Sequence, residues 1–248
     1  MANREKKYPS VQGISEKEHI EVVRDIFSTI TDRYDFLNHF LSLRQDIAWR
    51  RFTVKKMSFP EKGRLLDVAC GTGDLAIYAA IRYPKIEVTG LDFVQEMLDI
   101  AKKKTKEKSL VKRIDLVRGD ACFLPFPDAS FDVAGIAFGI RNIPDKKKAL
   151  SEMARVVVPG GQVMVLEMAF TRNWFSRILY YFYLNYMLPV VAKRFSRNQG
   201  AYEYLADSIM NFPKPEDFIR LMEDAGIRDI KVYRLTFGVT YLYVGKSI

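Results

Sequence analysis

The sequence predicts a doubly wound α/β domain built on a mostly parallel sheet, and three observations predict it. From residue 64 onward short apolar runs alternate with helical patterns, a glycine-rich turn follows the first run, and the runs are continuously apolar. Strands separated by helices pair in parallel through right-handed crossovers, and continuously apolar strands are typical of a sheet covered on both faces. Two final runs around Gly238 predict an antiparallel hairpin, which brings the expected sheet to seven strands.

Each element is expected from its own residues. Apolar residues recur at helical spacing in four segments, the last of which has Pro215 in its first turn and Gly226 as its stop. We expect helices at 74–82, 95–106, 146–157 and 215–225. We expect strands at 64–68, 86–91, 114–117, 131–136, 162–167, 229–235 and 239–244.

The N-terminal part of the chain differs from the rest. Residues 1–19 are polar and predict a solvated tail, whereas apolar residues recur every three or four positions from 21 to 51 and predict two or three helices. We therefore expect a tail and helical extension over 1–60, followed by the α/β domain over 61–248. Residues 1–13 have no apolar core and do not form a secretory signal.

An aromatic segment, expected to be a helical insert, interrupts the α/β alternation near 171–211. Its most apolar part, residues 178–192, is 15 residues long and contains Asn185 and Pro189. A membrane-spanning helix needs about 20 apolar residues, so this part is too short to span. We expect it to lie against a bilayer or to cover an apolar pocket.

Composition excludes several classes of protein. Of the 248 residues, 48% are apolar and 28% charged, which excludes a mostly disordered chain. The formal charge of +9 suits an anionic partner such as a membrane surface or a nucleic acid. Two cysteines, Cys70 and Cys122, and two histidines are too few for a disulfide framework and show no metal-ligand spacing. We expect no metal, buried thiols and a reducing, cytoplasmic setting.

The turn after the first expected strand carries a signal for a ligand site. It contains Gly71-x-Gly73-x-x-Ala76, and Asp92 follows nineteen residues beyond Gly73, at the end of the second strand. Glycine lets the backbone turn sharply and approach a ligand, and an acidic residue after the second strand accepts hydrogen bonds from ribose hydroxyls. Enzymes that use nicotinamide dinucleotides and enzymes that use S-adenosylmethionine share this layout, so the pattern leaves both open.

Charge favours S-adenosylmethionine. Asp67 and Asp74 flank the turn, where a dinucleotide would place its anionic pyrophosphate. S-adenosylmethionine has no phosphate and carries an ammonium and a sulfonium, which carboxylates stabilise. Alternatively, Asp67 is a structural partner and Asp74 an acidic residue in the first turn of a helix.

A second signal follows the third expected strand, at Gly119-Asp120-Ala121. A side-chain oxygen of Asp120 can accept a hydrogen bond from the adenine amino group, and the N–H of Ala121 can donate to a ring nitrogen. The carboxyl ends of parallel strands are where open α/β sheets bind ligands. Alternatively, Asp120 is a turn residue.

At these residues the chain resembles the class I S-adenosylmethionine-dependent methyltransferases, whose sheet is Rossmann-like. It is similar, more narrowly, to the ubiquinone/menaquinone biosynthesis C-methyltransferases. The motifs that carry this likeness are Tyr34-Asp35-Phe36-Leu37-Asn38, Phe138-Gly139-Ile140-Arg141-Asn142, Val165-Leu166-Glu167, Tyr202-x-Tyr204-Leu205-Ala206 and Asp224-Ala225-Gly226. The chain departs from that family at Leu37 and Asp46, where Met and His are usual.

The resemblance implies a set of site residues and a reaction. The reaction is methylation, with S-adenosylmethionine as the donor, of a ring carbon of a prenylated quinol: demethylmenaquinol or the analogous ubiquinone precursor. The positions that match cofactor-binding residues are Thr72, Asp92, Asp120 and Ala121, and those that shape the same pocket are Asp67, Gly71 and Gly73.

Carbon methylation also needs residues that act on the quinol. A ring carbon ortho to a hydroxyl is a better nucleophile once that hydroxyl, with a pKa of about 10 by comparison with tyrosine, has lost its proton. The catalytic candidates are Arg141 with Asn142, Tyr34 and Glu167. We expect Arg141 to stabilise the phenolate and Glu167 to accept a proton through water if burial raises its pKa. Alternatively, Arg141 and Glu167 are ion-pair residues and Tyr34 faces the core.

Several partners follow from the remaining residues. The aromatic residues of 174–186 are expected to shape the substrate mouth, ordinary core helices being the alternative, and the basic residues of 193–197 to contact anionic lipid head groups. The lysines of 102–104 and 146–148 are interpreted as solvated helix faces, so we expect no nucleic-acid partner. The sequence leaves open a homodimer, a methyltransferase for another small molecule or RNA, and a non-catalytic cofactor-binding component of a quinone-synthesis complex.

Overall fold

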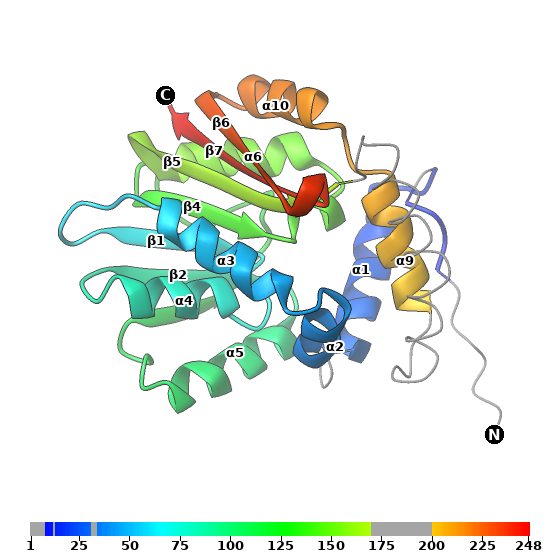
Figure 1. Cartoon of the computed structure of the whole chain (residues 1–248), viewed down its shortest axis with the longest axis horizontal. Helices are drawn as coiled ribbons and strands as arrows, with labels where there is room; N and C mark the ends of the chain where they lie inside the picture. Colours follow the sequence, from blue (N-terminus) through cyan, green and yellow to red (C-terminus); the bar gives the residue numbers. More distant parts are fainter. Residues whose placement is uncertain (1–7, 12, 31–33, 170–199) are drawn as a thin grey trace.

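The computed structural model describes residues 8–11, 13–30, 34–169 and 200–248, which fold around one seven-stranded sheet (Figure 1). The strand order is β3-β2-β1-β4-β5-β7-β6, with β7 antiparallel to both neighbours and the other pairs parallel. The strands are β1 Arg64–Val68, β2 Glu87–Asp92, β3 Ile114–Arg118, β4 Phe131–Ala137, β5 Val157–Met168, β6 Ile227–Leu235 and β7 Thr240–Ser247. The predicted fold class is confirmed.

The four helices predicted after residue 64 agree with their predicted positions to within about two residues at the ends, whereas the N-terminal helices extend about five residues beyond the predicted 21–51 on each side. With the numbering of Figure 1, the helices are α1 Glu16–Ile30, α2 Tyr34–Leu41, α3 Gln45–Lys56, α4 Asp74–Arg82, α5 Gln95–Glu107, α6 Lys146–Val156, α9 Gly200–Met210 and α10 Pro215–Asp224. Helix α9 is the described end of the expected insert, and residues 178–192 lie outside the described part of the chain.

Neighbouring strand residues face two separate cores, which explains the continuously apolar strands. On β1, Leu65 packs with α3 and α4, whereas Leu66 and Val68 pack with α6 and α10 on the other face. Strand β5 repeats the alternation. Val163 and Val165 belong to the core formed with α6 and α10, whereas Met164 and Leu166 belong to the core formed with α3 and α4. Because both faces are covered there, residues 65–68 of β1 and 163–167 of β5 are all buried, as their continuously apolar pattern predicted.

Strand β5 starts earlier than predicted. It was expected from residue 162, yet Val157 already pairs with Phe131 of β4. The next register pair joins Gln162 to Val133, so residues 158–161 bulge out of the ladder, with Gly160 at a φ of +79°. The Pro-Gly-Gly sequence therefore marks a bulge within a strand rather than a loop before it.

The end of the expected solvated tail is wrong. Helix α1 already begins at Glu16, and Ser15 and Glu18 form a capping box in which the Ser15 Oγ accepts from the Glu18 N–H and the Glu18 carboxylate accepts from the Ser15 N–H. His19 is buried, and its Nε2 lies 2.8 Å from the hydroxyl of Tyr204 on α9. The described residues before Ser15 also contact the rest of the protein, since the Tyr8 hydroxyl donates to Asp25 and the Val11 N–H to Asp207. The division of the chain at residue 60 stays a prediction.

The N-terminal helices α1 and α2 lie with α9 at one end of the sheet, beyond the strands' carboxyl ends (Figure 1). Helix α3 then runs along the sheet. A hydrogen bond from the Trp49 Nε1 to the Thr236 Oγ1 joins it to the turn between β6 and β7. This arrangement closes the carboxyl end of the sheet, where open α/β sheets bind ligands, with helices from both ends of the chain.

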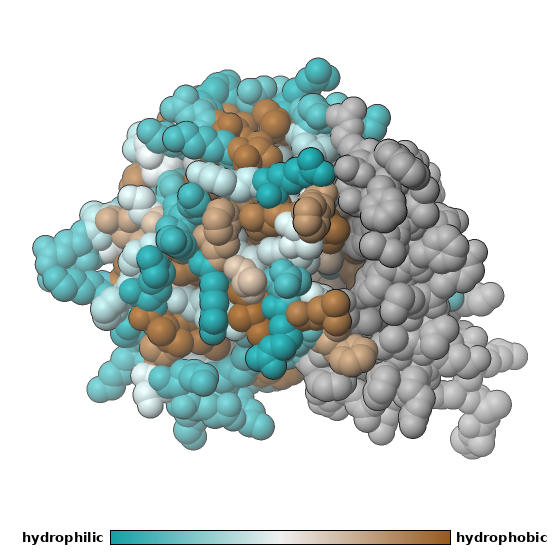
Figure 2. All heavy atoms as spheres, viewed as in Figure 1, coloured by the Kyte–Doolittle hydropathy of each residue, from teal (hydrophilic) through white to brown (hydrophobic). Residues whose placement is uncertain are grey.

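The surface in Figure 2 is hydrophilic around its outer edge, with hydrophobic residues gathered in separate groups nearer the middle. Large apolar side chains that are mostly exposed include Leu43 and Phe237. Within the residues that the structure describes, no helix combines the length and apolar character needed to cross a bilayer.

Two glycines allow the turn after β1 to be tested. Gly73 precedes α4 with a φ of +81°, and a Cβ added there would lie 3.2 Å from the Cβ of Ala101 on α5. Gly160 has a similar φ of +79°, but a Cβ there would meet nothing within 4 Å. We expect Gly160→Ala to lower the free energy of unfolding by about 1–2 kcal/mol through backbone strain alone, and Gly73→Ala by about 1 kcal/mol more through crowding.

Urea denaturation of both variants measures the difference. Equal losses of unfolding free energy in the two variants would show that the packing of α5 does not require the absence of a side chain at Gly73.

Candidate functional site

A cavity opens at the carboxyl ends of β1, β2 and β4, at the point where the strand order reverses. The space that it encloses, including its open mouth, is about 1070 Å³. Seven of the residues predicted from sequence line this cavity: Asp67, Gly71, Thr72, Asp92, Asp120, Ala121 and Asn142. Three others, Gly73, Arg141 and Glu167, do not line it.

Asp67 is the most buried acidic group of the cavity. It lies near the end of the central strand β1, and its neighbours across the ladders are Gly90 on β2 and Gly135 on β4. Its side chain is 1% exposed, and Oδ2 accepts a hydrogen bond from the Ala76 N–H in the first turn of α4. Other side chains fill the space beside these two glycines, such as Cys70 at Gly90 and Leu75 at Gly135.

Burial raises the pKa of Asp67 to about 7, and the nearby charges of Asp92 and Asp74 add to the rise. The Ala76 N–H and the positive charge of Arg50 oppose it. A carboxylate in this state gains from a cation placed beside it, since the charged form is otherwise poorly solvated.

The turn after β1 uses backbone conformations that favour glycine. Gly71 and Gly73 have φ values of +54° and +81°, and Ala69 adopts +50° although it carries a Cβ. The Ala69 Cβ lies against Gly139 of the turn after β4: a Cβ at Gly139 would stand only 2.8 Å from it. Gly73 therefore shapes the turn and its contact with α5 without reaching the cavity.

Asp92 organises the second strand end. Its Oδ2 accepts from the Gly71 N–H and its Oδ1 from the Val94 N–H, at 2.8 and 2.9 Å. Burial raises its pKa, and these backbone donors lower it. A carboxylate offers about four lone-pair sites, so Asp92 has acceptor capacity left for two hydroxyls of a ligand.

A charged cluster joins α2 to the turn. The Thr72 hydroxyl donates to the Asp35 Oδ1 at 2.7 Å, and the Lys104 ammonium contacts Asp35, Asp74 and the Thr72 hydroxyl. The neighbouring carboxylates raise the pKa of Lys104, although burial alone would lower it.

This cluster corrects two interpretations from sequence. Lys104 is not on a solvated helix face, because its side chain is only 23% exposed and bridges two carboxylates. Asp74 is therefore neutralised, and the repulsion expected for a pyrophosphate rests on Asp67 and not on the pair. Lys146 is also partly buried and donates to the Ile143 carbonyl.

Asp120 has the turn geometry that was the alternative to a binding role, and it also faces the cavity. Its Oδ1 accepts from the Cys122 N–H at 2.8 Å, which is an Asx turn, and the residue also lines the cavity beside the buried Ala121. The expected burial of the thiols holds for Cys70, whereas Cys122 is half-exposed.

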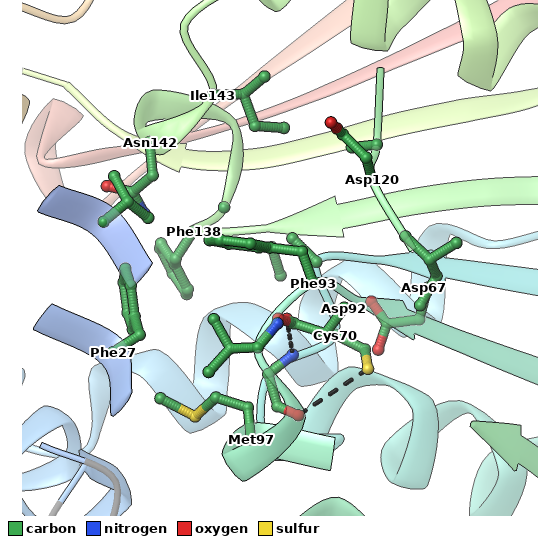
Figure 3. Close-up of a pocket in the computed structure, with 18 of the residues that line it drawn as sticks. Phe27, Asp67, Cys70, Asp92, Phe93, Met97, Asp120, Phe138, Asn142 and Ile143 are labelled. Atoms are coloured by element: carbon green, nitrogen blue, oxygen red, sulfur yellow. Dashed lines mark hydrogen bonds between the residues drawn. The ribbon is translucent and has the colours of Figure 1, made fainter. Parts of the chain in front are cut away.

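Apolar side chains cover the remaining walls (Figure 3). Phe27 reaches the cavity from α1, Met97 from α5 and Phe138 from the turn after β4, while Asp67, Cys70 and Asp92 lie together at the strand ends. The wall is thus apolar on the helix side and acidic on the strand side, as a ligand with an apolar body and cationic groups requires.

The four catalytic candidates are separated by the structure. Asn142 lines the cavity and its Oδ1 is buried with no hydrogen-bond partner among the described residues. Arg141 and Glu167 form a buried ion pair of 2.7 Å, and Glu167 also accepts from two backbone N–H groups. Tyr34 begins α2, and its side chain lies outside the described part of the chain.

Sequence reasoning missed Arg50. Its guanidinium lines the cavity from α3 and pairs with Asp46 one turn earlier, at 2.7 Å. The spacing of an acidic and a basic residue four apart was a signal for this contact, but nothing in it indicated that the pair faces a ligand site.

The structure suits S-adenosylmethionine. The carboxylates of Asp67 and Asp92 offer acceptors for cationic and hydroxyl groups, and the apolar wall offers a surface for a flat ring. No group of three or more His, Cys, Asp or Glu side chains that could hold a metal ion occurs in the described segments.

Comparison with known proteins agrees with this geometry. The model of the ubiE/COQ5 methyltransferase family matches residues 13–247. The chain belongs to the ubiE/COQ5 methyltransferase family. S-adenosylmethionine is therefore its methyl donor, which decides against the nicotinamide dinucleotide that the glycine turn alone had left open.

Individual relatives match this chain over most of their own length. The chain is 42% identical to the ubiquinone/menaquinone biosynthesis C-methyltransferase UbiE of Geotalea daltonii, over 92% of this chain and 97% of that protein. It is 41% identical to the demethylmenaquinone methyltransferase of Deinococcus radiodurans, over 91% and 92%. The crystal structure of a SAM-dependent methyltransferase from Aquifex aeolicus has the same fold, with a TM-score of 0.59 at 18% identity over 80% of this chain and 89% of that chain.

Asp67 links cofactor binding to stability. Because its pKa in the folded protein lies above the value of about 3.9 for an unfolded chain, the free energy of unfolding falls as the pH rises from about 4 to about 7. Asp67→Asn removes this fall, so the variant should gain roughly 2–4 kcal/mol relative to the natural chain between pH 4 and pH 8.

Urea denaturation without cofactor at both pH values measures the gain. In the same variant, S-adenosylhomocysteine should raise Tm less than in the natural chain, because its ammonium has lost a carboxylate. Parallel pH profiles for the two proteins would contradict the raised pKa.

Proposed function

We propose that this methyltransferase transfers a methyl group to a ring carbon of a prenylated quinol in menaquinone or ubiquinone biosynthesis, with demethylmenaquinol as the preferred substrate. The curated relatives carry these activities in their names and share more than nine-tenths of this chain's length. The observation that carries the proposal is the turn Ile140–Asn142, which places Asn142 at the cofactor cavity and Arg141 at a second, adjoining cavity.

The second cavity is polar, and its lining carries the acidic Glu16 as well as basic groups. Pro144 borders both cavities, so one turn of chain separates them. His19, Arg141 and Lys146 line the second cavity, together with Ser208 and Asn211 of α9 and its following turn. Burial lowers the pKa of both His19 and Lys146. An anion in this cavity would restore the charged forms of these two groups and would also meet the guanidinium of Arg141, and the phenolate of a quinol is the anion that the reaction requires.

Glu167 has a positioning role in this proposal. Its side chain is fully buried, and its two oxygens accept from Arg141 and from the Arg141 and Met168 backbone N–H groups. The geometry gives no support to the expected proton transfer through water. The carboxylate instead fixes the guanidinium of Arg141, whose Nη1 also donates to the Phe138 carbonyl at 2.7 Å.

The residues of the chain then act as follows. S-adenosylmethionine, when bound, supplies an electrophilic methyl group. Arg141 stabilises the phenolate oxygen, which raises the electron density of the neighbouring ring carbon, and Asn142 orients the ring through its unsatisfied Oδ1. As the bond from the ring carbon to the methyl group forms, the bond from that methyl group to sulfur breaks and S-adenosylhomocysteine is the leaving product. The phenol proton leaves to solvent before the transfer, and the ring carbon loses its proton as the phenol re-forms, so that one proton is released overall.

The setting of the enzyme follows from its substrate. A prenyl tail favours an apolar surface by about 0.8 kcal/mol per buried CH₂, so we place the protein in the cytoplasm with peripheral contact to the inner face of the membrane. The basic residues of 193–197 and the aromatic insert, which would make this contact, lie outside the described residues. Nucleic acid has no role in this proposal.

Methyl transfer to defined quinols tests the function. The full chain with S-adenosylmethionine should convert chemically reduced, short-tailed demethylmenaquinol into a product one methylene heavier. The oxidised quinone should not react, because its ring is an electrophile. A matched benzoquinol precursor measures the preference between the two rings. Absence of transfer to both quinols would favour the non-catalytic or other-substrate alternatives.

A paired substitution tests Arg141. Replacing only one member of the buried pair leaves an uncompensated charge, so Arg141→Gln is combined with Glu167→Gln. The double variant should fold and bind S-adenosylhomocysteine as the natural chain does, while kcat falls by about a hundredfold or more, as for the loss of one oxyanion donor. Unchanged kcat in a folded double variant would remove Arg141 from the mechanism.

A further inference from the structure

Arg50 is a buried cation in a cavity whose other charges are mostly acidic. Its side chain is 9% exposed, and its guanidinium carbon lies 5.0 Å from the centre of the Phe138 ring. Asp67, Asp92 and Asp120 line the same cavity. A guanidinium retained in this place requires anionic partners to offset its desolvation.

The protein supplies one such partner, and most of the donors of Arg50 stay unused. Nη1 donates to the Asp46 Oδ2 at 2.7 Å, and the described residues offer the guanidinium no second acceptor. An arginine has five N–H donors in a planar fork that matches a carboxylate. The unused donors therefore belong to the cavity and point to an anionic ligand group.

Asp46 is built to hold this arginine. Its Oδ1 accepts from the Ser42 hydroxyl at 2.7 Å, and its Oδ2 contacts the His39 Nδ1 at 2.8 Å as well as Arg50. Although burial opposes it, these contacts together lower the pKa of Asp46, so it stays a carboxylate. Contacts with His39 and Ser42 hold the Asp46 carboxylate in place, and this carboxylate in turn fixes the position of the Arg50 guanidinium.

We propose that Arg50 binds the α-carboxylate of S-adenosylmethionine and that Asp46 is its positioning residue. The amino-acid end of the cofactor is zwitterionic, and Asp67 and Arg50 supply the two opposite charges that it needs. Asp92 and Asp120 then receive the ribose and the adenine, which fixes the orientation of the cofactor along the cavity. The inference rests on the cofactor alone, and it stands or falls independently of the quinol substrate.

Ligands that differ only at the amino-acid end test the assignment by isothermal titration calorimetry. S-adenosylmethionine is compared with its decarboxylated form, and S-adenosylhomocysteine with 5′-methylthioadenosine, which lacks the amino-acid end. In Arg50→Gln we expect Kd to rise by about 10- to 100-fold for the two ligands with a carboxylate. For the decarboxylated and truncated ligands, Kd should stay as it is in the natural chain.

Arg51 provides the matched control. It follows Arg50 on α3, is exposed, and lies over the Tyr78 ring 5.5 Å away without lining the cavity. Arg51→Gln removes the same charge from the same helix, and it should leave all four affinities unchanged. A similar loss in both variants would mean that the net charge of α3 acts at long range, which would overturn the proposal.

Substitution of Asp46 tests the positioning role. Asp46→Asn should weaken only the two ligands with a carboxylate, and by less than Arg50→Gln does, because the cation is kept but loses its anchor. If the single variant is unstable, Asp46→Asn combined with Arg50→Gln removes both members of the buried pair and should bind like Arg50→Gln alone. Equal weakening of all four ligands by Arg50→Gln, or of none, refutes the assignment.

Discussion

A carboxylate buried at the end of the central strand is the constraint on which the site depends. Asp67 lies in the middle of the sheet between Gly90 and Gly135, and it has one hydrogen-bond donor, the Ala76 N–H. One donor does not compensate for full burial, which is why its pKa rises to about 7. The sheet thus holds an acidic group whose negative charge would be offset by a cationic group of the ligand, and the apolar helices over the cavity keep that charge out of water.

Around this carboxylate, ion pairs and nearby charges link the N-terminal helices to the elements of the α/β domain. Lys104 on α5 bridges Asp35 of α2 and Asp74 of α4, and Arg50 on α3 lowers the pKa of Asp67 from a different side. The N-terminal helices are thereby joined to the cofactor turn by charge as well as by apolar contact. Loss of these helices would leave an ammonium half-buried beside a single carboxylate, so the extension is an integral part of the cofactor site.

The fold was predictable because its signals are local. The strand at 64–68 and the helix at 74–82 agree residue for residue with β1 and α4, since period and turn residues decide them. The cofactor positions followed from the strand ends. The partner of Lys104 could not be predicted, because it lies 69 positions away in sequence. Burial separated Glu167 from its expected role, and only packing shows that both its oxygens are occupied by donors.

The contact between Ala69 and Gly139 ties the cofactor turn to the turn that carries Arg141 and Asn142. A methyl group at Gly139 would stand 2.8 Å from the one on Ala69, so the two positions share space for a single side chain. Ala69 has a left-handed backbone conformation, which glycine also adopts readily. Sequence change at this pair therefore has a direction: position 69 must lose its methyl group before position 139 gains one. The reverse order passes through a crowded ancestor, which makes the two sites dependent on each other in the history of the chain.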